Sequence, residues 1–224
     1  EGWSSGALLE IKNLEVSYGS ETGKGFELHL KNLVVSPGYK VGLVGEVGSG
    51  KSMLFEFLTR LKESPQGSIG WHERDLREVG LSRLRQEIAI VEQQITLFGE
   101  TIRTNITMGM SQPPDDAFIQ RLLNVTQLSK EIGHLPQGLD TVLGERGVNL
   151  SGGQKQRLAL ARALVRKPHL LILDDCFSAV DVTNEQGIIE GLFEAFPEIA
   201  VLCASHRLSV MKRMDEIWLL EKGR

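Results

Sequence analysis

A short apolar run that ends in a glycine-rich loop constrains the fold of this chain more than any other feature. Residues 40–44 suit a fully buried parallel strand, and the loop at residues 45–52 follows them directly. A helix that carries apolar side chains from Leu54 to Leu61 is expected to begin near Lys51. The order strand, glycine loop, helix predicts a parallel sheet with a phosphate-binding helix N-terminus.

The composition is that of one globular domain or two small ones. The chain has 224 residues, of which 41% are hydrophobic and 24% charged, enough to bury a real core. A net charge of −4 gives no reason to expect nucleic acid as a partner. Cys176 and Cys203 are expected to be reduced thiols, because two cysteines cannot form a disulfide framework. No apolar run approaches the ~18 residues that span a bilayer, and no signal peptide is found.

Other stretches of the chain predict the remaining elements. Residues 8–35 alternate like short strands, which predicts an antiparallel β layer. Buried strands are expected at residues 88–91, 170–173, 200–204 and 217–220. Residues 100–165 are mostly helix-like, and Asp115 or Asp116 can cap a helix after the two prolines at 113 and 114. Residues 1–6 are either a linker or a segment that docks through Trp3.

The loop at residues 45–52 matches Gly-x4-Gly-Lys-Ser in full. Its glycines let backbone N–H groups turn toward phosphate oxygens at the start of a helix. The lysine is expected to reach the β- and γ-phosphates, and the serine hydroxyl to ligate Mg²⁺. The expected nucleotide-binding residues of the loop are Gly45, Gly48, Ser49, Gly50, Lys51 and Ser52.

Two further patterns lie downstream. Asp174 ends an apolar strand, where phosphate-loop ATPases keep the aspartate that holds Mg²⁺, here expected to act through water. Ser151 is expected to N-cap a helix whose first residues, Gly152 and Gly153, expose their backbone amides. Gln154 completes this run.

Together, the phosphate loop, the run at residues 150–154 and the acidic pair at 174–175 resemble the ATP-binding domains of ABC transporters. The resemblance extends from about residue 8 to residue 224. It implies an α/β fold: a RecA-like phosphate-loop NTPase core with an N-terminal antiparallel β subdomain and an inserted α-helical subdomain. One ABC ATPase domain is expected over residues 1–224. The β layer and core would occupy about 8–94 and 166–224, and the helical subdomain about 95–165. The chain is expected to be part of a longer membrane transporter.

The resemblance also implies roles for single residues. In this family the signature closes over ATP held by a partner domain, so Ser151, Gly152, Gly153 and Gln154 would serve a partner's nucleotide. Tyr18 would stack on adenine, unless it is an ordinary strand tyrosine. These two assignments make ATP binding a property of two chains.

Three more roles follow from the same resemblance. Gln93 would ligate Mg²⁺ and sense the membrane partner, with a plain polar loop residue as the alternative. Asp181 would communicate between the two ATP sites, and His206 would hydrogen-bond the γ-phosphate. The expected catalytic residues are Lys51, Gln93, Asp175 and His206; the expected metal ligands are Ser52, Gln93 and Asp174.

One position departs from the family pattern. Active members carry glutamate after the strand-end aspartate, whereas this chain carries Asp175, followed by Cys176 in place of the usual alanine. The shorter side chain withdraws the carboxylate by about 1.5 Å. A misplacement of ~1 Å can cost ~100-fold in rate. We therefore expect slow hydrolysis at this chain's own site, with ATP binding retained, as in exporters with two unequal sites. A slow homodimer is the alternative.

Residues 135–147 resemble the exporter segment that touches the coupling helices of the membrane domains. The expected function is therefore ATP-driven export, with ATP and Mg²⁺ as cofactors. The expected partners are a second nucleotide-binding domain and transmembrane domains, which would hold this otherwise soluble domain at the cytoplasmic face of the membrane. A soluble ABC ATPase acting on DNA or the ribosome would carry a coiled-coil insertion or a basic face, and the sequence has neither. A regulatory domain in which ATP gates a channel with little turnover stays open because of Asp175.

Overall fold

A parallel sheet forms the centre of the structure, a computed structural model that describes residues 2–18, 26–144 and 149–224. Its strands are β5 (Lys40–Val44), β8 (Ile88–Val91), β9 (Leu170–Asp174), β10 (Ala200–Ala204) and β11 (Glu216–Leu219). They pair in the order β11-β5-β10-β9-β8, and every pair is parallel. The strands predicted from apolar runs are confirmed, the last one starting a residue earlier than expected.

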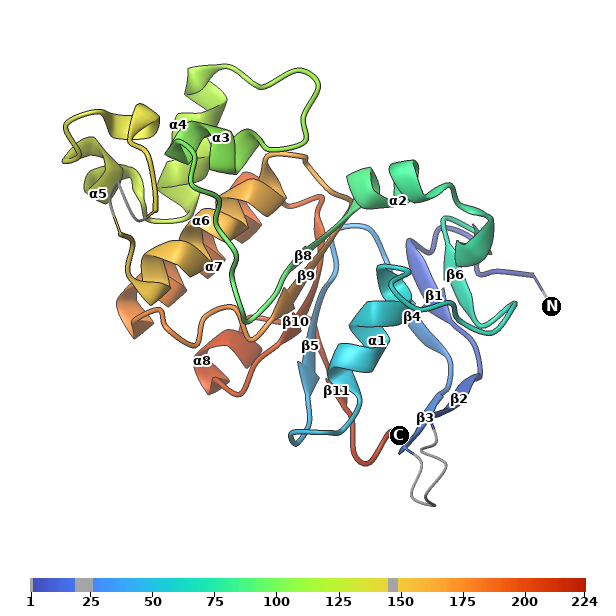
Figure 1. The fold of residues 1–224 in the computed structure, drawn as a ribbon. Coiled ribbons are helices and arrows are strands. Elements are labelled where there is room, and N and C mark those ends of the chain that lie inside the picture. The colour runs from blue at the N-terminus through green and yellow to red at the C-terminus, as the bar shows by residue number, and fades with distance from the viewer. Residues whose placement is uncertain (1, 19–25, 145–148) are drawn as a thin grey trace.

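The sheet is buried on both faces, as continuous apolar strands require. Alternate residues of β9 point to opposite sides: Leu171 and Leu173 belong to one hydrophobic cluster, Leu170 and Ile172 to the other. Figure 1 shows helix α1 on one side of the sheet and helices α6 and α7 on the other. The two cysteines are free thiols, both fully enclosed in the cluster on the α6 side, as predicted.

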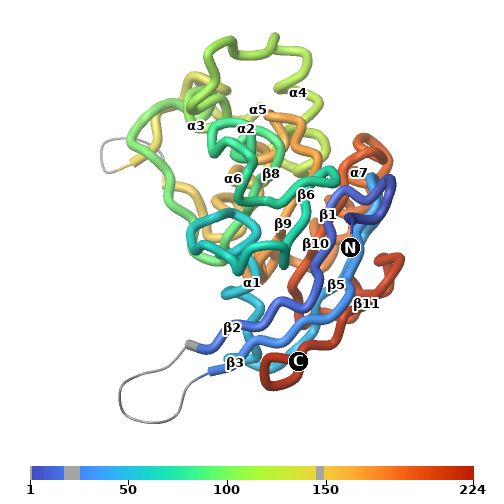
Figure 2. Tube along the Cα trace, turned by 90° about the vertical axis from the view of Figure 1, so that its right-hand side faces the viewer, coloured from blue at the N-terminus to red at the C-terminus, as the bar shows by residue number. Residues whose placement is uncertain are grey.

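The antiparallel β layer is confirmed, but it consists of two sheets. Strands β1 (Leu9–Ile11), β4 (Leu33–Val35), β6 (Ile69–Trp71) and β7 (Arg74–Asp75) pair in the order β4-β1-β6-β7. Strands β2 (Leu14–Tyr18) and β3 (Phe26–Leu30) form a separate hairpin, which extends away from the rest in Figure 2. Asn32 separates β3 from β4 with a φ of 42°, a left-handed conformation that asparagine tolerates. The β6–β7 hairpin was not predicted.

The helices surround this framework. They are α1 (Lys51–Leu58), α2 (Leu81–Glu87), α3 (Ile102–Thr107), α4 (Asp116–Val125), α5 (Ser129–Gly133), α6 (Gly152–Leu164), α7 (Val182–Ala195) and α8 (Leu208–Met211), with short 3₁₀ turns η1 (Leu76–Glu78) and η2 (Gly138–Asp140). Helices α3 to α5 lie together at the end of the molecule opposite the β2–β3 hairpin in both Figure 1 and Figure 2. Within the described part of the chain, no helix has the length and apolar character that crossing a bilayer requires.

Two helix predictions have different outcomes. Asp115 caps α4, because its side chain accepts a hydrogen bond of 2.8 Å from the backbone N–H of Phe118. The expected extension of α1 to Leu61 is wrong. Arg60 has a φ of 52°, which ends the helix, and the Leu61 side chain beyond it is 68% exposed.

The N-terminal segment docks on the β layer through Trp3. A Cβ atom on Gly70 of β6 would lie 2.4 Å from Cε3 of the Trp3 ring, so this glycine makes room for the indole. The Nζ atom of Lys12 lies 5.1 Å from the centre of the same ring, a cation–π contact. Of the two sequence alternatives for this segment, docking describes the structure.

A fully buried asparagine ties the loop before α3 to helix α6. The Oδ1 atom of Asn105 accepts hydrogen bonds from the backbone N–H of Phe98, at 3.0 Å, and from Nη2 of Arg162, at 2.8 Å. Its Nδ2 atom donates to the carbonyl oxygen of Phe98 at 3.0 Å. Asn105 is fully buried, so its side chain supplies an acceptor and a donor inside the protein where water does not reach.

Replacing Asn105 by alanine is expected to lower the free energy of unfolding by about 1–3 kcal/mol, because the Phe98 amide and the Arg162 guanidinium lose a buried acceptor. Urea unfolding followed by circular dichroism measures the loss. Asn124→Ala is the matched control, since Asn124 is exposed on α4 and should change stability by only a few tenths of this amount. Equal losses in the two variants would contradict the role of Asn105.

Candidate functional site

A hollow of about 490 Å³ opens at the carboxyl ends of the central strands. It lies between the loop after β5, the end of β9 and the segment after β10, and parallel pairing brings these three strand ends together. Its lining residues are Phe26, Val47, Gly48, Gly50, Lys51, Ser52, Met53, Gln93, Asp174, Asp175 and His206. Half of the predicted site residues therefore share one hollow, namely Gly48, Gly50, Lys51, Ser52, Gln93, Asp174, Asp175 and His206.

The loop at residues 45–52 takes a conformation that only glycine permits at several points. Gly48 and Gly50 have φ angles of 82° and 109°, in the left-handed region. A Cβ atom on Gly50 would lie 2.8 Å from the Phe26 ring, and one on Gly45 would lie 2.3 Å from the carbonyl oxygen of Leu220. The carbonyl oxygen of the buried Ser49 accepts a hydrogen bond of 3.1 Å from the N–H of Gly223, which ties the loop to the C-terminal segment.

The chemistry of this loop fits a nucleotide's phosphates. Helix α1 has Gly50 as its N-cap, which has no side chain to satisfy the first-turn amides. The Nζ atom of Lys51 donates hydrogen bonds to the carbonyl oxygens of Gly45 and Glu46, at 2.6 and 2.8 Å, so it already lies over the loop. Burial lowers the pKa of Lys51, although Asp174 and Asp175 oppose this effect. A phosphate would place a negative charge beside this ammonium group, and such a charge favours the protonated form of Lys51.

The acidic side of the hollow fits a hard cation. Burial, and then the negative charge of Asp175, raises the pKa of Asp174, while Lys51 acts in the opposite direction. A Mg²⁺ ion would relieve this repulsion, and the oxygens of Asp174, Gln93 and Ser52 are of the ligand type that it prefers. The Nε2 atom of Gln93 donates to Oδ2 of Asp175 at 3.3 Å, so the amide lies beside the acidic pair.

Asp175 has an unusual backbone conformation for a residue in this place. Its φ is 47°, in the left-handed region where aspartate and asparagine are enriched over longer side chains. Its N–H donates to the carbonyl oxygen of Ala204 at 2.9 Å, which joins the end of β9 to the end of β10. The chain therefore turns sharply here and directs the following residues toward α7.

The structure describes the position of the His206 side chain but not that of the Tyr18 side chain. His206 follows β10, is exposed and lines the hollow. Tyr18 is the last residue of β2, paired with Phe26 of β3, but its side chain lies outside the described residues, so adenine stacking stays a prediction. Phe26, which the sequence analysis missed, lines the hollow beside Gly50. Its only sequence signal is an aromatic residue at the start of an alternating run.

The run at residues 151–154 begins helix α6, as predicted. The Oγ atom of Ser151 accepts from the N–H of Gln154 at 3.2 Å, and Oε1 of Gln154 accepts from the N–H of Ser151 at 2.8 Å. This reciprocal pair is a capping box. None of residues 151–154 lines the hollow, so this run and the phosphate loop are separate features of the surface.

The start of α6 packs against the loop at residues 178–181. A Cβ atom on Gly153 would lie 2.6 Å from the carbonyl oxygen of Ala179, so only glycine permits this approach. The side chain of Gln156 accepts from the N–H of Ala179 and donates to Oγ of Ser178, both at 2.9 Å. Asp181 at the end of the loop caps α7 by accepting from the N–H of Asn184 at 3.0 Å, and this hydrogen bond lowers its pKa.

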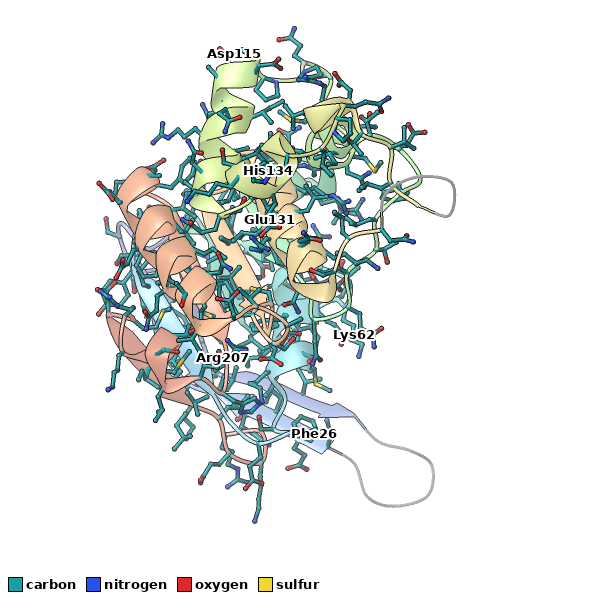
Figure 3. The ribbon with its side chains drawn as sticks, turned by 90° about the vertical axis from the view of Figure 1, so that its left-hand side faces the viewer. Phe26, Lys62, Asp115, Glu131, His134 and Arg207 are labelled. Atoms are coloured by element: carbon teal, nitrogen blue, oxygen red, sulfur yellow. The ribbon has the colours of Figure 1, made fainter. Side chains whose placement is uncertain are left out.

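Arg207, the residue after His206, binds the same loop. Its Nη1 atom donates to the carbonyl oxygen of Val180 at 2.9 Å and to Oε2 of Glu185 at 2.5 Å. Glu185 is fully buried, and Oγ of Ser209 also donates to it at 2.5 Å. Figure 3 shows Arg207 and Glu131 on one face of the molecule, with Phe26 on the β2–β3 hairpin. The sequence analysis missed Gln156, Glu185 and Arg207, because their partners lie more than 20 residues away along the chain.

Comparison with known proteins relates this geometry to a family. Residues 28–178 match the family model described as ABC transporter. The chain is 39% identical, over 96% of its own length, to a protein named ATP-dependent lipid A-core flippase from Pectobacterium atrosepticum. It is 36% identical, over 96% of its length, to multidrug resistance protein sirA from Leptosphaeria maculans. These matches cover 37% and 17% of the two relatives.

A solved structure gives the same result. The fold superposes on the structure of a bacterial Atm1-family ABC exporter with ATP bound, with a TM-score of 0.86 and 34% sequence identity. The superposition covers 96% of this chain and 37% of that one. The chain therefore spans little more than a third of the flippase and of this exporter chain, and about a sixth of sirA.

Replacing Gly153 by alanine is expected to destabilise the domain by about 1–3 kcal/mol, because the new Cβ atom would collide with the backbone of Ala179. Gly152→Ala is the matched control. Its Cβ atom would lie 3.3 Å from the Cβ atom of Ala179, which requires only a small shift, and alanine favours the helix. Thermal unfolding of both variants measures the difference, and equal effects would contradict the close approach of α6 to the loop.

The raised pKa of Asp174 predicts a pH-dependent stability. In the absence of Mg²⁺ and nucleotide, the ionised carboxylate is disfavoured in the folded state, so Asp174→Asn is expected to raise the free energy of unfolding at pH 7. Below the raised pKa the wild-type side chain is protonated, and the advantage of the variant should vanish toward about pH 4. Urea unfolding at both pH values measures this, and an advantage that grows on acidification would contradict it.

Proposed function

The chain is an ATP-binding domain of the ABC transporter family, and from this premise we propose that it hydrolyses ATP to drive export across a membrane. The single observation that carries the proposal is the hollow that Lys51, Asp174 and His206 share at the carboxyl ends of the central strands. A lysine over a glycine loop, an acidic pair and an imidazole are the groups that phosphoryl transfer needs. One relative is named as a lipid A-core flippase, so lipidic cargo is one class of substrate for the longer protein.

In this proposal each residue has a distinct task. Lys51 and the amides of the loop hold the β- and γ-phosphates and balance the charge that develops on them. Ser52, Gln93 and Asp174 hold Mg²⁺, which neutralises charge on the phosphate oxygens. Asp175 orients the attacking water and accepts its proton, and His206 hydrogen-bonds the γ-phosphate. The products are ADP and inorganic phosphate.

We propose that the signature run works on a second domain. Residues 151–154 are at the surface or nearly so and do not line the chain's own hollow, which supports a role toward a partner's nucleotide. The capping box and the packing of Gly153 on Ala179 hold this run in a fixed orientation. A head-to-tail pair of domains would then contain two ATP sites, each completed by the other chain. The partner is either a second copy or a different domain with a glutamate after its strand-end aspartate.

We further propose that transmembrane domains dock beside Gln93. A groove of about 400 Å³ lies at the edge strand β8, all four residues of which line it. Its lining also includes Leu84, residues 94–96 directly after Gln93, and the cationic side chains of Arg162 and Arg166. A short helix from a membrane domain would fit such a groove and would sense changes at Gln93. This arrangement would hold the domain at the cytoplasmic face of the membrane.

Residues 135–147 were expected to touch the same membrane domains. The structure describes this segment only up to Gly144, and residues 145–147 lie outside the described residues. Val142 is 45% exposed, and Thr101 beside it forms an isolated β-bridge with it. The proposed contact therefore concerns an exposed segment held against the start of α3. The division into a core and a helical subdomain at about residues 95 and 165 stays a proposal as well.

The regulatory alternative, in which ATP gates a channel with little turnover, is favoured by one observation. Asp175 adopts the left-handed conformation that aspartate tolerates better than glutamate does, so the short side chain suits the local backbone. In an active site optimised for turnover we would expect glutamate at this position, despite the backbone strain that it would cause. The rate of hydrolysis separates the two functions.

The variant Asp175→Glu is expected to raise the steady-state ATPase rate of the paired domain by about 10- to 100-fold, because the carboxylate reaches farther toward the attacking water. It should also lower stability slightly, because glutamate fits the left-handed backbone less well. Phosphate release at saturating ATP and Mg²⁺ measures the rate. An unchanged rate would show that the short carboxylate does not limit hydrolysis.

The control for this experiment is Lys51→Ala, which should weaken ATP binding at least ~10-fold, since a charge-assisted contact to the phosphates is lost. Titration with a fluorescent ATP analogue measures the affinity. Asp175→Glu should leave that affinity nearly unchanged. If Lys51→Ala binds ATP as tightly as the unchanged chain, the proposed nucleotide site is wrong.

A further inference from the structure

A second group of metal-binding side chains lies away from the hollow. His72, Glu87 and His169 each offer one ligand atom, and these atoms all lie within 4.8 Å of one another. His72 is in the turn between β6 and β7, Glu87 is the last residue of α2, and His169 directly precedes β9. Three segments that are distant in the sequence thus present two imidazoles and a carboxylate to one point. Figure 1 shows α2 and β6 on the same side of the molecule.

Backbone hydrogen bonds hold all three residues in place. The N–H of His169 donates to the carbonyl oxygen of Glu87 at 2.7 Å, and the carbonyl oxygen of His169 accepts from the N–H of Ala200 at 2.9 Å. The N–H of His72 donates to the carbonyl oxygen of Leu8 at 3.0 Å. The positions of the three side chains therefore follow from the paired backbone rather than from a free loop.

The turn that carries His72 is unusual in its residues. His72 and Glu73 have φ angles of 47° and 61°, so both central residues of this two-residue hairpin are left-handed. Such turns favour Asn-Gly or Asp-Gly, because most other residues are strained when φ is positive. Strain of this kind is commonly retained where a side chain has a function.

The two imidazoles already have the spacing of metal ligands. Nε2 of His72 lies 3.1 Å from Nδ1 of His169, and the rings meet nearly edge to face at 79°. Two nitrogens bound to one tetrahedral Zn²⁺ at about 2.0–2.1 Å would lie roughly 3.3 Å apart. Partial desolvation lowers the pKa of the His72 ring.

Glu87 is oriented by two donors. Its Oε2 atom accepts from Nε1 of Trp71, and its Oε1 atom from Nε of Arg83, both at 2.7 Å. Each carboxylate oxygen keeps a second lone pair, and donors of this kind commonly orient metal ligands. The positive charge of Arg83 opposes a cation, but its side chain is 62% exposed and the charge is balanced by Glu87, whose side chain is 13% exposed.

We propose that His72, Glu87 and His169 form a binding site for Zn²⁺ that joins the β6–β7 hairpin to the start of β9. Two imidazoles and one carboxylate favour Zn²⁺ over Mg²⁺, which prefers oxygen ligands alone. His169 precedes the amino end of β9, whereas Asp174 is at its carboxyl end, five residues or about 16 Å away. The bound ion is thus distinct from the Mg²⁺ of ATP hydrolysis, and it stabilises the contact between the β layer and the central sheet.

The test is titration of the 224-residue chain with ZnCl₂ in excess MgCl₂, followed by calorimetry. One ion is expected per chain, with an affinity at least ~10-fold weaker in both His72→Asn and His169→Ala. Asparagine tolerates the left-handed turn, so His72→Asn should fold. His134→Ala is the matched control, because His134 is an exposed histidine directly after α5, outside the cluster of three ligands, and should leave binding unchanged.

Thermal unfolding gives a second readout. With Zn²⁺ at about 100 times its dissociation constant, the midpoint should rise by roughly 5–10 °C in the unchanged chain and in His134→Ala, and not in the other two variants. Substituting Co²⁺ should give the visible absorption bands of a four-coordinate site. The proposal is overturned if the chain binds no Zn²⁺ under these conditions, or if His72→Asn and His169→Ala bind it as tightly as the control. In either case the two histidines form only a hydrogen-bonded pair.

Discussion

The parallel pairing of β5, β10 and β9 is the constraint on which the rest of the structure depends. Leu43 and Asp174 both lie opposite Ala204 in the register, so the three strands end at one level. Lys51 begins the helix that follows the loop after β5, Asp174 ends β9 and His206 follows β10, so the three residues line a single hollow. A shift of one residue in either pairing would separate these groups and would also turn the buried side chains of β9 and β10 to the wrong faces.

Helix α6 is the second element on which the arrangement relies. Its 13 residues form a rigid rod of about 20 Å. Its first turn packs on the loop at residues 178–181, Gln154 and Arg157 bind Glu131 of α5, and Arg162 near its end binds the carbonyl oxygen of Thr96 at 2.9 Å. Helix α6 therefore joins the loop at residues 178–181 to the segment after Gln93 through direct contacts.

Prediction succeeded where the physical cause was local. The capping box of Ser151 and Gln154, the cap at Asp115 and the buried strands each depend on a few neighbouring residues, so the pattern was sufficient. It failed at α1, whose apolar face continues to Leu61 in the sequence although the backbone turns at Arg60. Phe26 and Arg207 could not be found in this way, because their roles come from contacts with Gly50 and Glu185, which only the folded chain brings near.

The sequence by itself determined the family and the short carboxylate at Asp175, because these reside in motifs of a few consecutive residues. Only the tertiary structure decided that residues 151–154 stand apart from the chain's own hollow, that Arg207 holds the loop before α7, and that two distant histidines face each other across Glu87. The physical reason is the range of the interactions. Hydrogen bonds and metal ligation act over about 2–3 Å, and sequence separation says nothing about which distant residues come within that distance until strand order and register are known.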